Sequence, residues 1–205
     1  MRRRFSRPVI GLAGGIGAGK SEVAAILADA GCVVVDSDAL ARQALADPAV
    51  ISRITEWWGD DVLDASGGVD RRRVADIVFS DETERRRLES VVHPWVEARR
   101  REQFEAAPAD APALVIDAPL LFEAGLDAEC DAVLFVDADR RTRLERLRAG
   151  RGWDEKEVQR REESQWPLDV KRRSADYVIR NHGDRAALAA EVHHALQQIT
   201  AFQDG

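Results

Sequence analysis

The sequence predicts an α/β protein with a three-layer α/β/α architecture, built around a five-stranded, mainly parallel sheet. Two observations support this prediction. Short apolar runs with the character of buried strands alternate with segments of helical periodicity, which is typical of a parallel sheet covered by helices on both faces. One block of about 60 residues between the second and third runs is mostly helical, more than a simple crossover between parallel strands requires. That block indicates a helical insertion.

The first apolar run, residues 9–12, leads into the glycine-rich segment GGIGAGKS, residues 14–21, and then into an apolar-periodic helix. The segment matches the phosphate-loop pattern GxxxxGK[ST] at every fixed position, so the expected fold is P-loop kinase-like. Glycines let successive backbone N–H groups turn toward phosphate oxygens, and the following helix N-terminus adds donors and partial positive charge. We expect Lys20 to reach the β- and γ-phosphates of a nucleoside triphosphate and the Ser21 hydroxyl to bind Mg²⁺. The expected ATP contacts in this loop are Gly15, Ile16, Gly17, Ala18, Gly19, Lys20 and Ser21.

The second apolar run, residues 32–35, ends at Asp36-Ser37-Asp38. Open α/β sheets bind ligands at the carboxyl ends of their strands. A carboxylate at that edge, beside a phosphate loop, could orient an attacking hydroxyl and accept its proton. The alternative is that one aspartate caps the following helix while the other is solvated.

The helical block, residues 47–112, is the natural place for a second substrate. Its arginine triplets alternate with acids, which favours solvated helix faces. The pair His93-Pro94 predicts a bend, because proline biases the preceding residue away from helix. His93 itself can be structural or substrate-binding.

The third apolar run, residues 113–117, ends at Asp117, as in a Walker-B strand whose aspartate holds Mg²⁺ directly or through water. A fourth run, residues 132–136, is followed by Asp137. A fifth run, residues 176–179, precedes a final amphipathic helix.

Between the fourth and fifth runs, residues 139–173 are polar, helical and dense in arginine. Gly150 and Gly152 interrupt this stretch, and Trp166-Pro167 ends its second half. The pattern predicts two helices around a glycine hinge, forming a mobile lid whose guanidinium groups bind the triphosphate. Any single arginine could instead be solvated or ion-paired.

Composition limits the function classes. A chain of 205 residues suits one domain with appendages, and a net charge of −7 argues against whole-surface nucleic-acid binding. No apolar stretch approaches the ~20 residues that a membrane span requires. Cys32 and Cys130 lack metal or redox spacing, so we expect reduced, buried thiols in a cytosolic protein. The basic N-terminal segment MRRRFSR is not expected to be a secretion signal, because cleavage after the apolar run would destroy the phosphate loop.

With these motifs assembled, the chain resembles the dephospho-coenzyme A kinase family over nearly everything from Val9 to Gly183. The resemblance is carried by GLAGGIGAGKS (11–21), VVDSDALAR (34–42), GGVDRRRVADIVFSDETERRRLESVVHPWV (67–96), DAPLLFEAG (117–125) and QWPLDVKRRSADYVIRNHG (165–183). It implies transfer of the ATP γ-phosphate to the ribose 3′-hydroxyl of dephospho-CoA, with Mg²⁺, by a cytoplasmic enzyme that is monomeric or weakly oligomeric. No nucleic-acid or membrane partner is expected.

The resemblance also assigns residues. Asp38 becomes the candidate base, Lys20 the phosphate clamp and Asn181 a neighbour of the adenine, while Arg140 and Arg161 become lid candidates for the phosphates. The implied substrate-binding residues are Asp36, Asp38, Arg71, His93 and Asp117, the implied metal ligands are Ser21 and Asp117, and the implied catalytic residues are Asp38, Lys20 and Arg140.

The implied domains are a nucleotide-binding core (1–46, 113–138 and 174–205), a substrate-binding insertion (47–112) and a lid (139–173). The chain departs from the family in places. Members usually carry glutamine where Arg143 stands and an arginine around Gly150, for which Arg148 or Arg151 could substitute. Trp58-Gly59 replaces the usual Phe-Gly.

Two other interpretations stay open. One is another P-loop kinase, acting on a nucleoside monophosphate, shikimate or a sugar acid, since one scaffold hosts many acceptors. The His-Pro insertion and the DAPLLFE segment argue against it. The other is a non-enzymatic nucleotide switch, but the stretch nearest to a guanine-reading Asn-Lys-x-Asp motif, residues 181–184, has no lysine.

Overall fold

The computed structural model describes residues 5–201. Residues 1–4 of the basic N-terminal segment and residues 202–205 belong to the predicted core ranges but lie outside the described residues. The chain divides into two compact units, one made of the residues up to Asp36 together with those from Phe104 onward, and the other of Ser37–Gln103. Each unit is described by itself below.

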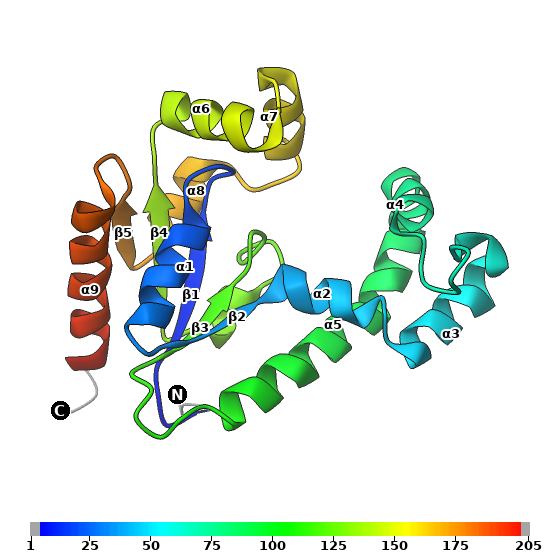
Figure 1. The fold of residues 1–205 in the computed structure, drawn as a ribbon, viewed down its shortest axis with the longest axis horizontal. Helices are drawn as coiled ribbons and strands as arrows, with labels where there is room; N and C mark the ends of the chain where they lie inside the picture. The colour runs from blue at the N-terminus through cyan, green and yellow to red at the C-terminus, as the bar shows by residue number, and fades with distance from the viewer. Residues whose placement is uncertain (1–4, 202–205) are drawn as a thin grey trace. The chain divides into compact units, whose positions relative to one another are not determined.

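Within the described residues, the first unit contains one sheet of five strands in the order β2-β3-β1-β4-β5, with every neighbouring pair parallel. The strands are β1 (Val9–Gly14), β2 (Val33–Asp36), β3 (Leu114–Asp117), β4 (Ala132–Asp137) and β5 (Tyr177–Arg180). Figure 1 shows β1 in the middle of the sheet. The predicted parallel five-stranded sheet is confirmed. Because the strands run the same way, their carboxyl ends meet at one edge.

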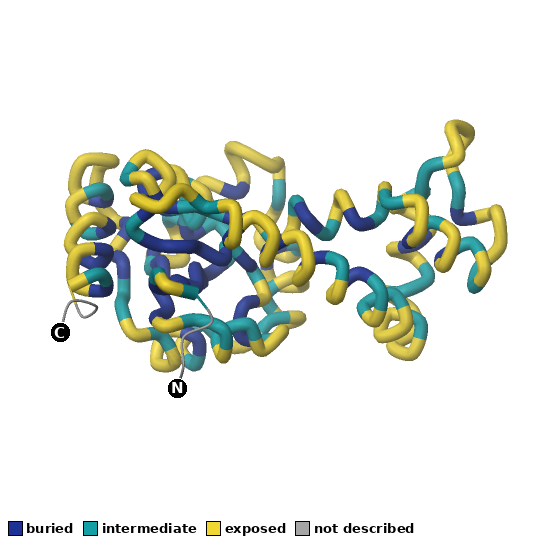
Figure 2. Tube along the Cα trace, turned by 90° about the horizontal axis from the view of Figure 1, so that it is seen from below, coloured by how far each residue is buried: buried dark blue, intermediate teal, exposed yellow. Residues whose placement is uncertain are grey.

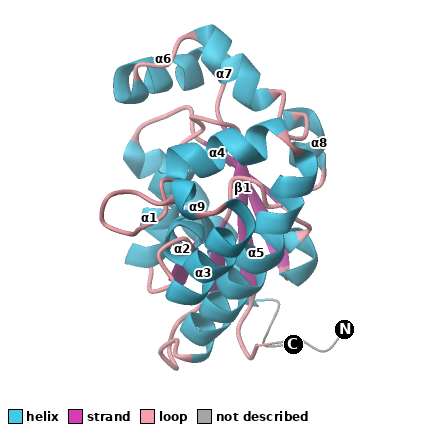
Figure 3. Cartoon of the chain, turned by 90° about the vertical axis from the view of Figure 1, so that its right-hand side faces the viewer, coloured by secondary structure: helices cyan, strands magenta, loops and turns pink. Residues whose placement is uncertain are grey.

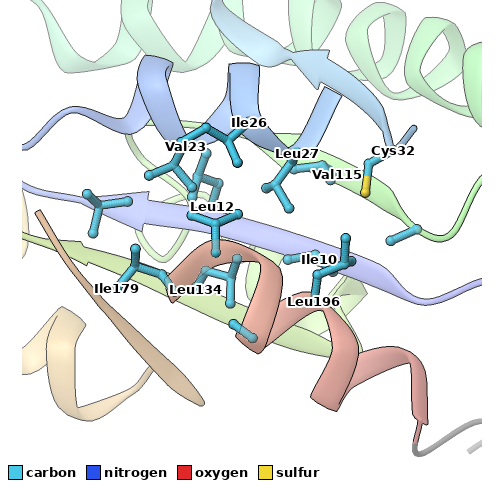
Figure 4. Packing of buried hydrophobic residues seen from close by; sticks show 14 of the residues in the cluster. Ile10, Leu12, Val23, Ile26, Leu27, Cys32, Val115, Leu134, Ile179 and Leu196 are labelled. Carbon is cyan, nitrogen blue, oxygen red and sulfur yellow. The ribbon is translucent and has the colours of Figure 1, made fainter. Parts of the chain in front are cut away.

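Helices α1 (Lys20–Asp29) and α9 (Arg185–Ala201) pack together on one face of this sheet. Figure 4 shows the core that they close, in which Leu12, Leu27 and Leu134 are 0% exposed. Burying a side chain of this size contributes about 1.5–3 kcal/mol. In Figure 2, buried and exposed segments alternate along α9, which is the mark of a helix with one face on the core.

The opposite face of the sheet is covered by the segment after β3 and by α8 (Leu168–Arg173), which packs against β1 and β4. Side chains alternate between the two faces of a strand. Gly11, between two core residues, therefore points away from α1, and Leu121 and Cys130 approach its backbone there. The short helix η2 (Leu126–Glu129) lies in the same segment. These two layers of helix around one sheet give the predicted three-layer arrangement.

The second unit is built from helices joined by loops, as Figure 3 shows. They are α2 (Ser37–Ala44), α3 (Pro48–Trp58), η1 (Asp60–Val62), α4 (Arg71–Ser80) and α5 (Glu82–Glu105), whose last two residues belong to the first unit. Val50, Ile54, Val62 and Val74 form the unit's buried apolar core. Aspartates cap two of the helices, since the side chains of Asp47 and Asp70 accept N–H groups of the first turns of α3 and α4.

The expectation that Pro94 takes His93 out of the helix is wrong, because α5 continues through both residues. Proline removes one N–H donor, so the carbonyl of Ser90, four residues earlier, loses its helical partner. The other bonds of this 24-residue helix outweigh that loss. The rule that proline disfavours helix at the preceding residue is a bias, and here the long helix overrides it.

The predicted lid of two helices around a glycine hinge is also corrected. Three helices lie between β4 and β5, namely α6 (Arg140–Arg151), α7 (Glu155–Glu162) and α8. Gly150 lies inside α6, and the helix ends instead at Gly152, which takes a left-handed φ of 67°. Trp166-Pro167 does not end the stretch, because Pro167 stands at the N-cap position of α8.

Between residues 5 and 201, the structure has no helix with both the length and the apolar character required to cross a membrane.

Candidate active site

The phosphate-loop segment joins β1 to α1 at the carboxyl edge of the sheet. The Ala18 N–H donates to the Gly15 carbonyl at 3.0 Å, which folds the loop back on itself. Gly19 stands at the N-cap position of α1 with a left-handed φ of 96°. The first N–H groups of a helix have no partner within it, and a glycine has no side chain with which to cap them. The loop therefore offers backbone donors to an anion at the helix N-terminus.

Three side chains from distant parts of the chain hold the carbonyl oxygens of this loop. Arg143 Nη1 donates to the Ile16 carbonyl at 3.2 Å. Asn181 Nδ2 donates to the Ala18 carbonyl at 2.8 Å, and Arg146 Nη1 donates to the same oxygen at 3.2 Å. Sequence reasoning missed Arg143 and Arg146 as loop contacts. Asn181, expected near the adenine, is buried against the loop, and its contact with adenine stays a prediction.

Two loop glycines are required by this close packing. Gly17 and Gly19 both have left-handed φ angles, which other residues rarely adopt. A Cβ on Gly17 would lie 2.8 Å from Leu147 Cγ, and one on Gly19 would lie 2.2 Å from Asn181 Nδ2. The glycines thus allow α6 and the end of β5 to reach the loop backbone.

The aspartates that end β2 and β3 lie side by side. Asp36 and Asp117 are register partners on β2 and β3, and Asp117 is also paired with Leu12 of β1. Carboxylate and hydroxyl oxygens are the ligands that Mg²⁺ prefers, and Ser21 supplies a hydroxyl in the first turn of α1. Among residues 5–201, three or more His, Cys, Asp or Glu side chains do not gather into a metal cluster. Mg²⁺ usually binds through one or two carboxylates plus substrate phosphates, so this donor set fits it.

The two lid arginines predicted to bind phosphate are held by acids of α7. Arg140 donates to Glu155 at 3.1 Å and to Glu162 at 3.0 Å, and these hydrogen bonds raise the pKa of Arg140. Arg161 donates to Glu157 at 2.6 Å, with its guanidinium 4.2 Å from the centroid of the Trp153 ring. To bind a phosphate, either arginine would have to leave its glutamate partners. The phosphate contact of these arginines stays a prediction.

Lys171 of α8 is a buried cation that joins the lid to the segment after β3. Its side chain is 1% exposed, and its Nζ lies 2.7 Å from Glu123 Oε1. Nζ also donates to Gln165 Oε1 at 3.1 Å and to the Pro119 carbonyl at 3.3 Å. The backbone N–H of Trp166 donates to the same Glu123 oxygen at 2.7 Å. Two of the segments that carry the family resemblance, residues 117–125 and 165–183, are therefore fastened together.

A cavity of about 220 Å³ lies beside the loop at the carboxyl end of β4. Gly15, Asp137, Arg143 and Arg172 are among its lining residues. Nearby, Asp139 caps α6 by accepting the Thr142 N–H, and this hydrogen bond lowers the pKa of Asp139 to about 2.

The remaining predicted site residues belong to the second unit. Asp38 stands in the first turn of α2, two residues after Asp36. Arg71 is the first residue of α4, and His93 is an exposed residue of α5. Their substrate contacts stay predictions. The unit also has a cavity of about 470 Å³ lined by residues that include Asp47, where Trp95 Nε1 donates to Asp47 Oδ2 at 2.9 Å.

Both cysteines are free thiols. Cys32 is buried, as expected, and burial raises the pKa of its thiol to about 11. Cys130 is only partly buried.

Comparison with known proteins identifies the family. A family model described as dephospho-CoA kinase matches residues 8–187. The dephospho-CoA kinase of Synechococcus sp. (strain CC9605) is 42% identical over 198 residues, which cover 94% of this chain and 94% of that protein. The crystal structure of TT1252 from Thermus thermophilus matches with a TM-score of 0.84 and 34% identity, over 94% of this chain and 97% of that chain. Dephospho-CoA kinase from Campylobacter jejuni matches with a TM-score of 0.63 over 95% of this chain and 98% of that chain, but its 21% identity shows a shared fold alone.

The matched range includes the phosphate loop, both strand-end aspartates, the helical unit and the three helices after β4. The family model and the Synechococcus relative each span most of the sequence. The chain therefore belongs to the dephospho-CoA kinase family.

Proposed function

We propose that the protein transfers the γ-phosphate of ATP to the ribose 3′-hydroxyl of dephospho-CoA and so forms coenzyme A. The observation that carries this proposal is the GGIGAGKS loop between β1 and α1, in a chain of this family. Backbone donors and a lysine at that position are the elements that hold a nucleoside triphosphate. Strand-end carboxylates next to the loop supply the other chemistry that phosphoryl transfer needs.

The loop residues have distinct roles in this proposal. Backbone N–H groups of residues 15–21 bind the phosphates, and the ammonium group of Lys20 offsets charge on the transferring group. Ser21 and Asp117 would hold Mg²⁺, with Asp36 beside Asp117 on the neighbouring strand. When bound, the ion supplies positive charge that neutralises the phosphate oxygens.

Asp38 acts as the general base. The ribose 3′-oxygen attacks the γ-phosphorus, a new O–P bond forms, and the bond from the γ-phosphorus to the β-bridging oxygen breaks. The proton of the hydroxyl passes to the Asp38 carboxylate, and ADP leaves. Asp38 follows the Asp36 strand end by two residues, which is the support for its assignment.

The helical unit, the lid and the residue after β5 supply the remaining contacts. We assign Arg71 and His93 to dephospho-CoA, Arg140 and Arg161 to the ATP phosphates, and Asn181 to the adenine side of ATP. We also propose a cytoplasmic protein, in keeping with its free thiols, that is monomeric or weakly self-associating.

An acceptor panel tests the proposed function. ATP consumption would be measured with dephospho-CoA, a nucleoside monophosphate, shikimate and a sugar acid, and the product identified by mass and by the position of the new phosphate. We expect turnover with dephospho-CoA and a 3′-phosphorylated product. Activity on another acceptor, with none on dephospho-CoA, would overturn the proposal in favour of a different P-loop kinase. ATP binding without acceptor-dependent turnover would favour a nucleotide switch.

A further inference from the structure

Side chains from α6 and from the end of β5 donate hydrogen bonds to carbonyl groups of the phosphate loop. These bonds are called the grip on the loop. Figure 1 shows α6 passing over the carboxyl end of β1, where the loop begins. Arg143 of α6 reaches the Ile16 carbonyl, and Asn181, the residue after β5, reaches the Ala18 carbonyl. The loop is therefore held at two peptide groups that are two residues apart.

The geometry of a peptide group turns this grip into an orientation of N–H donors. In a planar trans peptide, the C=O of one residue and the N–H of the next point in opposite directions. Holding the Ile16 carbonyl toward α6 directs the Gly17 N–H away from α6. Holding the Ala18 carbonyl toward Asn181 likewise directs the Gly19 N–H away from Asn181. Both N–H groups then point away from the side chains that hold the carbonyls, as donors to an anion in a phosphate-binding loop would.

Burying the Arg143 side chain costs free energy of desolvation. The residue is 5% exposed, and its Nε is buried without a hydrogen-bond partner in the described structure. Glu162 of α7 forms an ion pair with its Nη1. Replacing both partners of a buried ion pair by apolar residues is often neutral or stabilising, and Glu162 also pairs with Arg140 at 3.0 Å, so this ion pair is a weak reason for an arginine at position 143. A buried arginine that adds little stability is therefore better explained by its bond to the loop.

We propose that Arg143 and Asn181 are positioning residues that fix the Ile16–Gly17 and Ala18–Gly19 peptide planes before the nucleotide binds. Arg146 adds a second bond to the Ala18 carbonyl and a 3.3 Å bond to Asn181 Oδ1, but it is exposed, so its share is smaller. This inference rests on the proposed nucleotide-binding function. A loop that is ordered in advance binds phosphate without the entropy loss of ordering it, so the grip raises affinity for every nucleotide with a β-phosphate.

The test compares Arg143→Met with Arg141→Met, a control on an exposed residue of the same helix. ADP affinity is measured by isothermal titration calorimetry, Tm by differential scanning calorimetry, and KM for ATP and kcat with dephospho-CoA as acceptor. For Arg143→Met we expect ADP to bind about tenfold more weakly, a loss of about 1.4 kcal/mol. Tm should fall only modestly, because Glu162 keeps its ion pair with Arg140. KM for ATP should rise more than kcat falls. Arg143→Lys, which keeps one donor, should recover part of the affinity, and Arg141→Met should match the wild type.

Asn181→Asp is the second variant. It keeps the size of the side chain but replaces the Nδ2 donor with an oxygen that repels the Ala18 carbonyl. Affinity for ADP should therefore fall at least as far as in Arg143→Met, and so should affinity for inorganic pyrophosphate, which has no adenine for Asn181 to contact. Wild-type ADP affinity in Arg143→Met and Asn181→Asp would overturn the inference while leaving the proposed function intact. An equal loss in Arg141→Met would overturn it too. Failure of the wild-type protein to bind ADP would instead remove the proposed function, and the inference with it.

Discussion

The nucleotide-binding unit uses several polar side chains to join distant elements, whereas many arginines of the helical unit pair within one helix. In the nucleotide-binding unit, the bond from Arg143 to Ile16 spans 127 residues of sequence, and the bond from Asn181 to Ala18 spans 163. In the helical unit, Arg86 pairs with Glu82 four residues away, and Arg99 pairs with Glu102 three residues away. The long-range bonds join distant elements of the fold, whereas the short-range pairs connect neighbouring turns of one helix.

Burial explains why this difference matters for function. Side chains of the Arg99–Glu102 pair are 50% and 60% exposed, so water and salt screen their attraction. Lys171 and Asn181 are nearly inaccessible to water, so each of their polar groups needs a partner fixed in place. Arginine and lysine counts alone therefore say little about which cations shape the site, and the following predictions test the contrast.

The largest effect is expected from Lys171→Met. This change leaves Glu123, which is 15% exposed, without its buried cation. Removing one partner of a buried ion pair typically destabilises a protein by about 3–5 kcal/mol. We expect a loss near the lower end of that range in urea unfolding, because the Trp166 N–H still donates to Glu123.

The double variant Lys171→Met/Glu123→Gln serves as the control for this pair. With both charges gone, no unpaired ion is left, so most of the lost free energy of unfolding should return. If instead the two single losses simply add in the double variant, the pair is not coupled, and its role in fastening residues 117–125 to α8 is wrong.

The next effect is a loss of rate in Lys20→Ala. Removing one preorganised donor to developing charge typically costs about 3–4 kcal/mol in activation free energy, about 10²–10³ in rate. We expect kcat with dephospho-CoA to fall by that factor while Tm changes little, since Lys20 is a partly buried residue at the start of α1 and not part of the apolar core. Lys156→Ala is the matched control, because Lys156 is an exposed lysine of α7. Near wild-type turnover in Lys20→Ala would exclude the proposed role of Lys20.

The sequence predicts those features of the molecule that are determined by residues close together along the chain. The phosphate loop and the aspartates after β2 and β3 follow from short motifs, and the parallel sheet follows from strand and helix alternation. That logic failed at Pro94, where a local bias lost to a 24-residue helix, and at Gly150, which α6 passes without ending. At both positions the hydrogen bonds of the surrounding helix outweigh the local preference of proline or glycine against helix.

The long-range grip on the loop could not be predicted in the same way. Arg143 and Arg146 lie in a stretch where arginine is common, and composition does not distinguish them from Arg141. The resemblance to the family singles out Arg143, where members usually carry glutamine, but it does not give the partner of this side chain. Their partners are backbone carbonyls, which leave no residue-type signal at the other end of the contact. Lys171 gives a weak signal, as a lysine in a chain that otherwise prefers arginine, but its Glu123 partner appears only when the fold brings residues 48 positions apart together.

The smallest effect is expected from Arg86→Ala in the helical unit. Arg86 and Glu82 are 73% and 63% exposed and form an (i, i+4) pair with the acid on the N-terminal side, the favourable orientation for a helix. Such pairs contribute about 0.3–0.5 kcal/mol. Urea unfolding should therefore show a loss within this range, which 1 M NaCl should largely abolish by screening. A salt-insensitive loss as large as that of Lys171→Met would mean that exposed, local pairs do hold this unit together. The contrast between the two units would then fail.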